Sequence, residues 1–242
     1  MKKYFVVADV HGFYNEMTFA LLMRGFDQSD PDHVFVSLGD LLDRGPAPAS
    51  CLSFVNALPA DRKILIRGNH EDLLEDCLAR EAFYDHDVHN GTMDTVLALA
   101  GPNGYDLFQR DADGFFAAVR DNPLLKKYLS ATRDYAEIGK NVLVHGWIPD
   151  RGTAPDGDPL HGNWKEARWS NGMEKWQEGD RLEGRTVLCG HWHTSWGHAV
   201  IEKRGSEFGE DADFSPFVAP GIVALDACTV FSHKVNCLVL RD

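Results

Sequence analysis

Five short apolar runs along the chain each end on a glycine, a carboxylate or an imidazole. They are YFVVADVHG (4–12), VFVSLGD (34–40), ILIRGNH (64–70), VLVHG (142–146) and VLCGHWH (187–193). Continuous apolar runs of this length are typical of buried strands, and open α/β sheets place their ligands at the carboxyl ends of strands. We therefore expect the polar residues at these five ends to meet at one edge of a sheet.

The segments between the first three runs predict helices. Apolar residues recur at helical spacing over 13–24 and stop at Gly25, and similar patterns cover 47–58 and 71–83. Strand and helix thus alternate over about the first seventy residues, which predicts a parallel βαβαβ unit with right-handed crossovers.

The rest of the chain is less regular. Residues 85–136 predict a helical insertion with a break at GPNG (101–104), and 146–185 predict an irregular segment rich in tryptophan. We expect further strands at 138–144, 197–202, 222–225 and 235–240, with a solvated acidic loop at 205–216. The predicted fold class is α/β, a single domain over 1–242 in which two packed mixed β-sheets are flanked by helices. The second sheet is expected to come from the C-terminal third.

Length, composition and charge exclude several classes of protein. With 242 residues and 44% hydrophobic residues, the chain can form one large domain. Its net charge of -13 argues against binding to a nucleic acid backbone. It has no run of about 18 apolar residues, so we expect no membrane partner. Its five cysteines form no CxxC pair, which favours a reducing compartment, so we expect a soluble cytoplasmic protein of unknown oligomeric state.

The strand ends offer oxygen and imidazole donors without a thiolate. The candidate metal ligands are Asp9, His11, Asp40, Asn69, His145, His191 and His193. This donor set suits two borderline-hard divalent cations better than a structural zinc. Two cations about 3.5–4 Å apart can supply a nucleophile and neutralise the oxygens of a phosphoryl group. The pattern therefore predicts a two-metal hydrolase, with Asp40 as the carboxylate shared by both cations.

The ligands divide into two predicted sets that share Asp40. The first cation is assigned Asp9, His11, Asp40 and His193, and the second Asp40, Asn69, His145 and His191. Manganese is the first choice of cation, with iron or zinc as alternatives, because such sites take these metals according to supply.

Three residues beside the ligands are expected to act on the substrate. His70 follows Asn69 and is the candidate proton donor to the leaving oxygen, and Asp43 is expected to raise the pKa of His70. Arg44 offers a guanidinium fork for two phosphate oxygens.

Taken in order, the motifs DVHG, GDLLDRG, GNHE, VHG and GHWHT resemble the calcineurin-type metallophosphoesterase superfamily. The DRG and His-Glu endings resemble its phosphoprotein phosphatase branch, which includes bacterial and phage members and the related symmetrical diadenosine tetraphosphate hydrolases. The resemblance implies the metal and proton-donor roles given above. It also implies phosphate binding by Arg44, Asn69 and a second arginine, for which Arg168 is preferred to Arg151. The GHxH form of the last motif is commoner in the wider superfamily.

Two features leave alternatives open. All six tryptophans lie between 147 and 196 and either fill a core or form an aromatic wall beside the metals. The leading function is a metal-dependent phosphatase that acts on phosphoserine or phosphothreonine in proteins. The first alternative is hydrolysis of dinucleoside polyphosphates or other nucleotides, and the second is a non-catalytic scaffold with the same fold. The expected partner is a phosphorylated protein or a small phosphoester.

Overall fold

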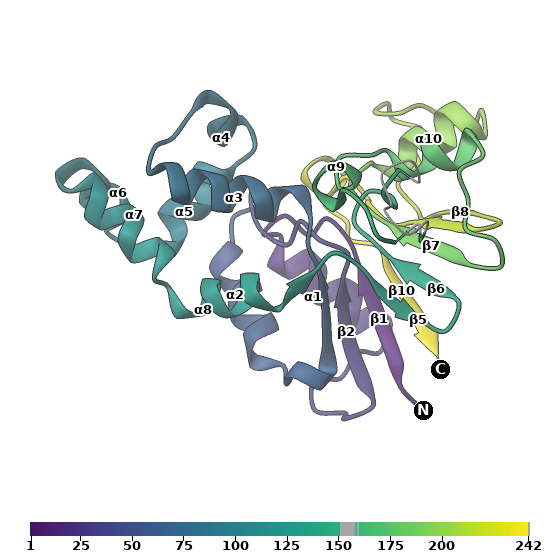
Figure 1. Ribbon diagram of the computed structural model, residues 1–242, viewed down its shortest axis with the longest axis horizontal. Helices are drawn as coiled ribbons and strands as arrows, with labels where there is room; N and C mark the ends of the chain where they lie inside the picture. The colour runs from purple at the N-terminus through teal and green to yellow at the C-terminus, as the bar shows by residue number, and fades with distance from the viewer. Residues whose placement is uncertain (151–157, 159, 242) are drawn as a thin grey trace.

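The computed structural model describes residues 1–150, 158 and 160–241, which form two five-stranded sheets with helices outside them (Figure 1). The first sheet has the order β10-β1-β2-β3-β4. Its strands are β1 (Lys3–Val7), β2 (His33–Ser37), β3 (Lys63–Ile66), β4 (Thr132–Arg133) and β10 (Cys237–Arg241). Strands β1 to β4 are parallel, and β10 pairs antiparallel with β1. The predicted parallel βαβαβ unit is therefore confirmed.

Three helices connect the first strands and cover one face of the first sheet. They are α1 (Tyr14–Met23), α2 (Pro48–Ala57) and α3 (Asn69–Arg80), and a short 3-10 helix, η1 (Ala60–Arg62), precedes β3. Successive side chains of a strand point to opposite faces. Phe5 and Val7 of β1 accordingly pack with the helices, whereas Val6 and Ala8 pack between the two sheets.

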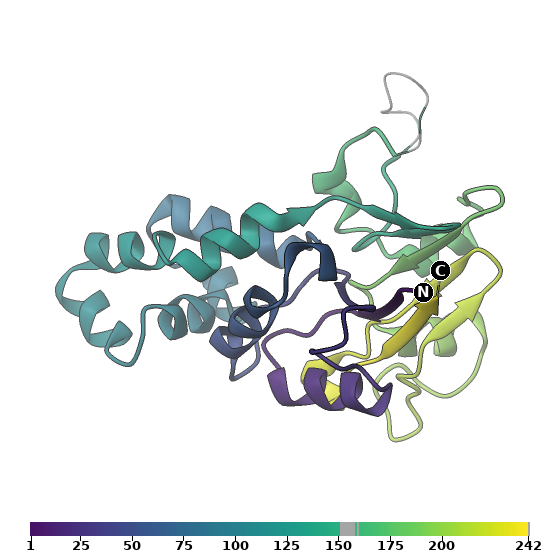
Figure 2. The ribbon, with the colours of Figure 1, turned by 90° about the horizontal axis from the view of Figure 1, so that it is seen from below.

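The predicted helical insertion is an arm of five helices that extends away from the sheets (Figure 2). These are α4 (Asp85–His89), α5 (Thr92–Leu99), α6 (Gly104–Arg110), α7 (Ala112–Arg120) and α8 (Pro123–Ala131). Edge-to-face and tilted ring contacts among Phe83, Phe108, Phe115 and Phe116 pack the arm together, with ring centroids 5.1–6.2 Å apart.

The second sheet has the order β5-β6-β7-β9-β8. Its strands are β5 (Ala136–Ile138), β6 (Asn141–Leu143), β7 (Thr186–Cys189), β8 (Phe217–Ala219) and β9 (Ile222–Ala224). Strands β6, β7 and β9 are parallel, so their carboxyl ends share one edge. Leu143 and Leu188 pack against Val36 and Ile66 between the sheets, which confirms the α/β class with two packed mixed sheets.

Short helices fill the segments between these strands. They are α9 (Trp164–Ala167), α10 (Gly172–Gln177), α11 (Thr194–Trp196), a π-helix η3 (Gly197–Ile201) and α12 (Thr229–Ser232).

The structure corrects three details of the sequence analysis. The predicted strand 138–144 is a hairpin, because Gly139 takes a positive φ of 57° and turns the chain between β5 and β6. The predicted strand 197–202 is the π-helix η3 with Glu202 at its end, where His198 bonds Glu202 across four residues at 2.8 Å. The second sheet begins at Ala136, and β10 joins the first sheet.

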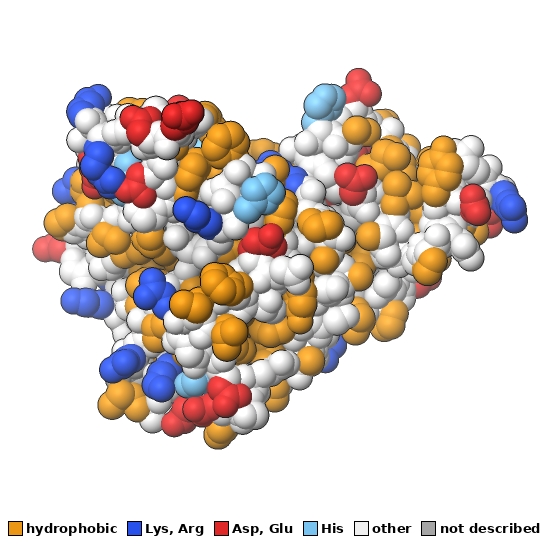
Figure 3. Space-filling model, turned by 180° about the vertical axis from the view of Figure 1, so that it is seen from behind, with side chains coloured by type: hydrophobic (Ala, Val, Ile, Leu, Met, Phe, Trp, Pro, Cys, Tyr) orange, Lys and Arg blue, Asp and Glu red, His pale blue; other side chains and the backbone are white. Residues whose placement is uncertain are grey.

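The described residues form no basic stripe on the face of the molecule seen in Figure 3. Lysine and arginine side chains on that face are scattered among acidic and apolar groups. Among the described residues, no helix combines the length and the apolar character that crossing a bilayer requires.

Candidate active site

The strand ends converge as predicted, and the backbone there is unusually constrained. Ten non-glycine residues in the described part of the chain have a positive φ. Six of them are predicted site residues: Asp9, His11, Asp40, Asp43, Arg44 and His191. Such conformations cost about 1–3 kcal/mol each and tend to collect at functional sites. The local backbone therefore directs these six side chains toward the same site.

Asp40 lies at the centre of this site. Its carboxylate belongs to two groups whose potential ligand atoms all lie within 4.8 Å of one another, one with His11 and His70 and one with His145 and His191. Nε2 of His11 is 3.7 Å from Oδ2 of Asp40, and Nε2 of His145 is 3.4 Å from Oδ1. Asp40 thus has the position that a carboxylate shared by two cations requires.

The four residues of the second predicted set lie together. Oδ1 of Asn69 is 2.8 Å from Nε2 of His145, and Nδ1 of His145 donates to the carbonyl of Leu38 at 2.8 Å. The centroid of the His191 ring lies 5.1 Å from that of the His145 ring. The backbone carbonyl of Leu38 thus orients the His145 ring, an arrangement common among metal-binding histidines.

The first predicted set is less complete. Nδ1 of His11 donates to the carbonyl of Leu42 at 3.1 Å, so its Nε2 faces Asp40. Both carboxylate oxygens of Asp9 accept from the backbone N–H of His191 at 3.0 Å. A side chain at position 190 would collide with that carboxylate, which explains Gly190.

His193 is not in either group of potential ligands. Its Nε2 lies 3.0 Å from Oε1 of Glu207. The ring of Phe208 packs edge-to-face against the His193 ring, with the ring centroids 4.6 Å apart. The acidic loop, which was expected to be solvated, therefore reaches His193 and holds it. The role of His193 as a ligand remains a prediction.

The buried charges of the site fit divalent cations. Burial, and then the neighbouring carboxylate of Asp226, raise the pKa of Asp9 well above its usual value. Burial raises the pKa of Asp226 to about 6, and Asp40 adds to the effect. Asp40 itself has a lowered pKa, because the attraction of His145 and His70 outweighs its burial. Three carboxylates buried together need positive charge nearby, and two divalent cations would supply it.

Asp226 was absent from the predicted site. It follows β9, whose Ala224 pairs with Cys189 of β7, so it lies at the same sheet edge as His191. Its Oδ1 accepts from the N–H of Cys228 at 2.7 Å. The signal was available in the sequence, since the apolar run 222–225 ends on this aspartate.

His70, Asp43 and Arg44 form a connected group beside Asp40. Nδ1 of His70 lies 2.8 Å from Oδ2 of Asp43, which also accepts from the hydroxyl of Thr92 at 2.8 Å. Burial alone would lower the pKa of His70, but the carboxylates of Asp40 and Asp43 raise it above the usual value. The exposed Arg44 places Nη1 3.3 Å from His11 and Nη2 3.1 Å from His70.

Residues beyond the predicted set hold Asp40 in place. The carboxylate of Glu71 accepts from the backbone N–H groups of Asp40, Leu41 and Gly68 at 2.7–3.1 Å. The buried hydroxyl of Tyr128 donates to the same carboxylate at 2.7 Å. Tyr128 lies on α8, so the helical arm contributes to the site through contacts that sequence spacing does not reveal.

Arg168 has protein partners for its terminal nitrogens. Nη1 lies 2.7 Å from Oδ2 of Asp72, and Nη2 pairs with Asp134. Asp72 also pairs with Arg67 at 2.6 Å. The structure therefore gives Arg168 a place in an ion-pair network, and its binding of phosphate remains a prediction. Arg151, the other candidate, lies outside the described residues.

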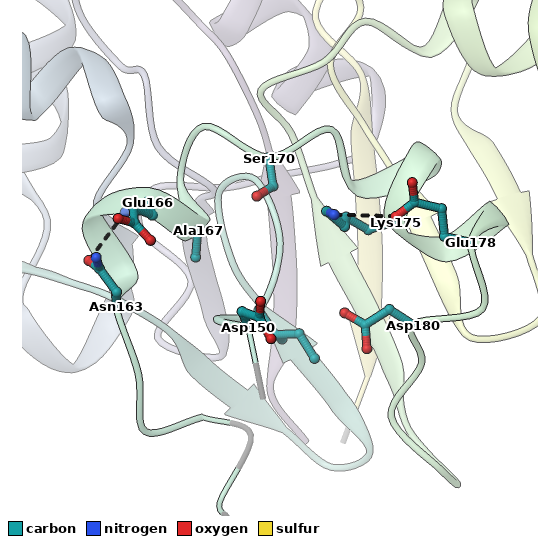
Figure 4. Close-up of a pocket in the computed structure, with 9 residues that line it drawn as sticks. Asp150, Asn163, Glu166, Ala167, Ser170, Lys175, Glu178 and Asp180 are labelled. Carbon is teal, nitrogen blue, oxygen red and sulfur yellow. Dashed lines mark hydrogen bonds and ion pairs between the residues drawn. The ribbon is translucent and has the colours of Figure 1, made fainter. Parts of the chain in front are cut away.

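A separate hollow lies beside α10 (Figure 4). Its lining includes Asp150, Glu166, Glu178 and Asp180, and its Lys175 pairs with Glu178 at 3.2 Å. None of the predicted ligands lines this hollow among the described residues, so it is distinct from the group around Asp40.

Comparisons with known proteins agree with this geometry. The model of the calcineurin-like phosphoesterase family matches residues 2–195. The asymmetrical bis(5'-nucleosyl)-tetraphosphatase PrpE of Geobacillus thermodenitrificans is 28% identical over 207 residues, 75% of this chain and 82% of that protein. Serine/threonine-protein phosphatase 1 of Salmonella typhimurium is 36% identical over 74 residues, 31% of this chain and 32% of that protein. The crystal structure of a cold-active protein-tyrosine phosphatase from a Shewanella species aligns with a TM-score of 0.56 at 16% identity, covering 100% of this chain and 76% of that one.

The two stacked sheets and the His/Asp groups that share Asp40 define a metal-dependent phosphoester hydrolase. The chain belongs to the calcineurin-like phosphoesterase family, which confirms the resemblance found in its motifs.

Proposed function

We propose that this chain hydrolyses phosphoesters at the centre around Asp40, with His70 as the proton donor to the leaving oxygen. The observation that carries the proposal is the hydrogen bond between His70 and Asp43, which holds the His70 ring next to Asp40 and His11. A general acid needs a proton that it holds near neutral pH and can release, and the raised pKa of His70 meets that requirement.

The proposed ligands keep the sets given above. Asp9, His11, Asp40 and His193 would hold the first cation, and Asp40, Asn69, His145 and His191 the second. When bound, two such cations, manganese by preference, supply a nucleophile and offset the charge of the phosphoryl oxygens.

The other residues position the substrate and move the proton. The guanidinium of Arg44, exposed between His11 and His70, can bind two phosphate oxygens. Asn69 and Arg168 complete the proposed phosphate-binding set. Asp43 holds the ring of His70, so Nε2 of His70 faces the centre, where the leaving oxygen receives its proton.

Two substrate classes have specific support. The match to the Geobacillus tetraphosphatase spans three quarters of this chain and favours a dinucleoside polyphosphate. The GDLLDRG and GNHE motifs and the shorter match to the Salmonella enzyme favour phosphoserine or phosphothreonine in a protein. We further propose that residues 1–242 act as one domain.

The test compares wild type with His70→Asn in the presence of manganese, using diadenosine tetraphosphate, a phosphoserine peptide and glycerol phosphate. We expect kcat of the variant to fall by about 10²–10⁴-fold for every substrate that wild type hydrolyses. His86→Asn, an exposed histidine of α4, is the matched control and should keep full activity. Equal activity of His70→Asn and wild type would refute the proposed proton donor.

A further inference from the structure

The structure divides the six tryptophans into two groups. Trp147 is buried in the second core cluster, and Trp164, Trp176 and Trp196 pack against that cluster. These four fill a core. Trp169 and Trp192 do not belong to it, and 49% and 38% of their surfaces are exposed.

The two exposed tryptophans both adjoin the metal-ligand candidate His191. The ring centroids of Trp169 and Trp192 lie 5.9 Å and 6.1 Å from that of His191, at interplanar angles of 82° and 61°. They come from different segments, one between α9 and α10 and the other after β7.

Close backbone packing brings Trp169 to this position. A side chain at position 146 would lie within 2.8 Å of the carbonyl oxygens of Ala167, Arg168 and Ser170. Gly146, directly after His145, therefore allows the loop 167–170 to pack against the end of β6. Trp169 lies in this loop, so the close packing at Gly146 places its ring beside that of His191.

The position of these rings relative to the proton donor limits what they can bind. His70 and Arg44 lie with His11 in one group, whereas His191 belongs to the other group that shares Asp40. A phosphomonoester carries its organic group entirely on the leaving oxygen, which is the side of His70. A ring held beside His191 must instead belong to a substituent that stays on the phosphoryl group.

We propose that Trp169 and Trp192 form a platform that binds the base of a nucleotide whose phosphate is attacked at this centre. Nucleobases stack on aromatic side chains, and a nucleoside is a substituent that remains on the phosphoryl group. The oxygen of water joins that phosphorus, the anhydride bond to the next phosphate breaks, and His70 protonates the departing phosphate oxygen. This inference rests on the proposed function and identifies the substrate of that hydrolysis as a nucleoside polyphosphate.

Calorimetric binding of AMP and of ribose 5-phosphate to the manganese-loaded protein tests the platform. AMP is the product in which the attacked phosphate keeps its nucleoside, and ribose 5-phosphate carries a hydroxyl group in place of the base. We expect AMP to bind wild type at least about tenfold more tightly, as stacking of one base implies. Trp169→Ala and Trp192→Ala should each lose most of this difference and leave ribose 5-phosphate unaffected. Trp192→Phe should restore much of it.

Tyr105→Ala removes an exposed aromatic ring from α6 in the helical arm and should leave both affinities unchanged. Equal binding of AMP and ribose 5-phosphate to wild type would overturn the proposal. So would an unchanged preference for AMP in both alanine variants that thermal unfolding shows to be folded. Tighter binding of phosphotyrosine than of AMP, lost in both variants, would also overturn it in favour of an aryl phosphate.

These results are separable from the proposed hydrolysis. If wild type hydrolyses glycerol phosphate and His70→Asn does not, the assignment of His70 as proton donor is supported, whatever the affinity for AMP. If His70→Asn keeps full activity while the alanine variants lose AMP binding, the proposed mechanism fails and the base platform stands.

Discussion

The ring of His70 and the carboxylate of Asp43 form a hydrogen bond of 2.8 Å, and both side chains are buried. Asp43 is itself held by the helical arm, since Thr92 donates to its carboxylate and Thr95 accepts from its backbone N–H. The helical insertion between β3 and β4 therefore supports the site directly, because it holds Asp43, the partner of the proposed proton donor His70.

Asp43→Asn should shift the pH dependence of kcat/KM. The Asp43 carboxylate contributes to the raised pKa of His70, so its loss lowers that pKa. A general acid works only while protonated, and activity is lost as pH rises through its pKa. The alkaline limb of the profile should therefore move to lower pH, with wild type and variant most alike at the acid end. An alkaline limb at the wild-type position would contradict the assignment of His70.

Glu71→Gln should weaken metal binding. The carboxylate of Glu71 accepts three backbone N–H groups around Asp40, and an amide has only one oxygen with which to do so. Loss of such support typically reduces metal affinity by about 10–100-fold, and calorimetric titration with manganese would measure it. Glu75→Gln, on the exposed side of the same helix, is the control. Indistinguishable titrations of the two variants would show that Glu71 does not position Asp40.

The strand ends were predictable from sequence because their chemistry is local. A buried apolar run followed by Asp, Asn or His predicts a strand with a polar residue at its carboxyl end. The parallel pairing of β1, β2 and β3 then brings Asp9, Asp40 and Asn69 to one edge of the sheet. Asp226 obeys the same rule at the end of β9.

The remaining contacts depend on tertiary packing that no short pattern encodes. Tyr128 reaches Glu71 across 57 positions from another helix, and Glu207 reaches His193 from a loop whose acidic composition suggests only solvation. The apolar residues of the predicted strand 197–202 fit the period of a helix as well as that of a strand. The bond of His198 to Glu202 and the packing of Gly197 under Met173 and Phe217 favour a helix there.

Arg168→Ala separates a structural role from phosphate binding. The guanidinium of Arg168 is largely buried between Asp72 and Asp134, so its removal leaves a buried carboxylate with one fewer partner. We expect the free energy of unfolding to fall by about 1–3 kcal/mol, measured by urea denaturation. Arg185→Ala breaks the exposed pair with Glu137 and should cost about 0–1 kcal/mol. If Arg168→Ala instead kept full stability and raised KM alone, phosphate binding would be its main role.

Trp147→Ala should destabilise the second sheet. Trp147 is among the largest fully buried side chains, and its Nε1 donates to Asp180 at 2.8 Å. Truncation of a buried tryptophan costs about 3–5 kcal/mol, which thermal unfolding would detect as a clear fall in Tm. A Tm equal to that of wild type would show that this core contributes little to stability.

Metal content of Asp40→Asn tests the central claim most directly, because Asp40 is the one side chain common to both groups of potential ligands. We expect wild type to bind two manganese ions per chain by equilibrium dialysis and elemental analysis. Asp40→Asn should bind them far more weakly, while Asp121→Asn, at an exposed ion pair, should match wild type. Two ions held by Asp40→Asn with wild-type affinity, or none held by wild type, would contradict a shared carboxylate.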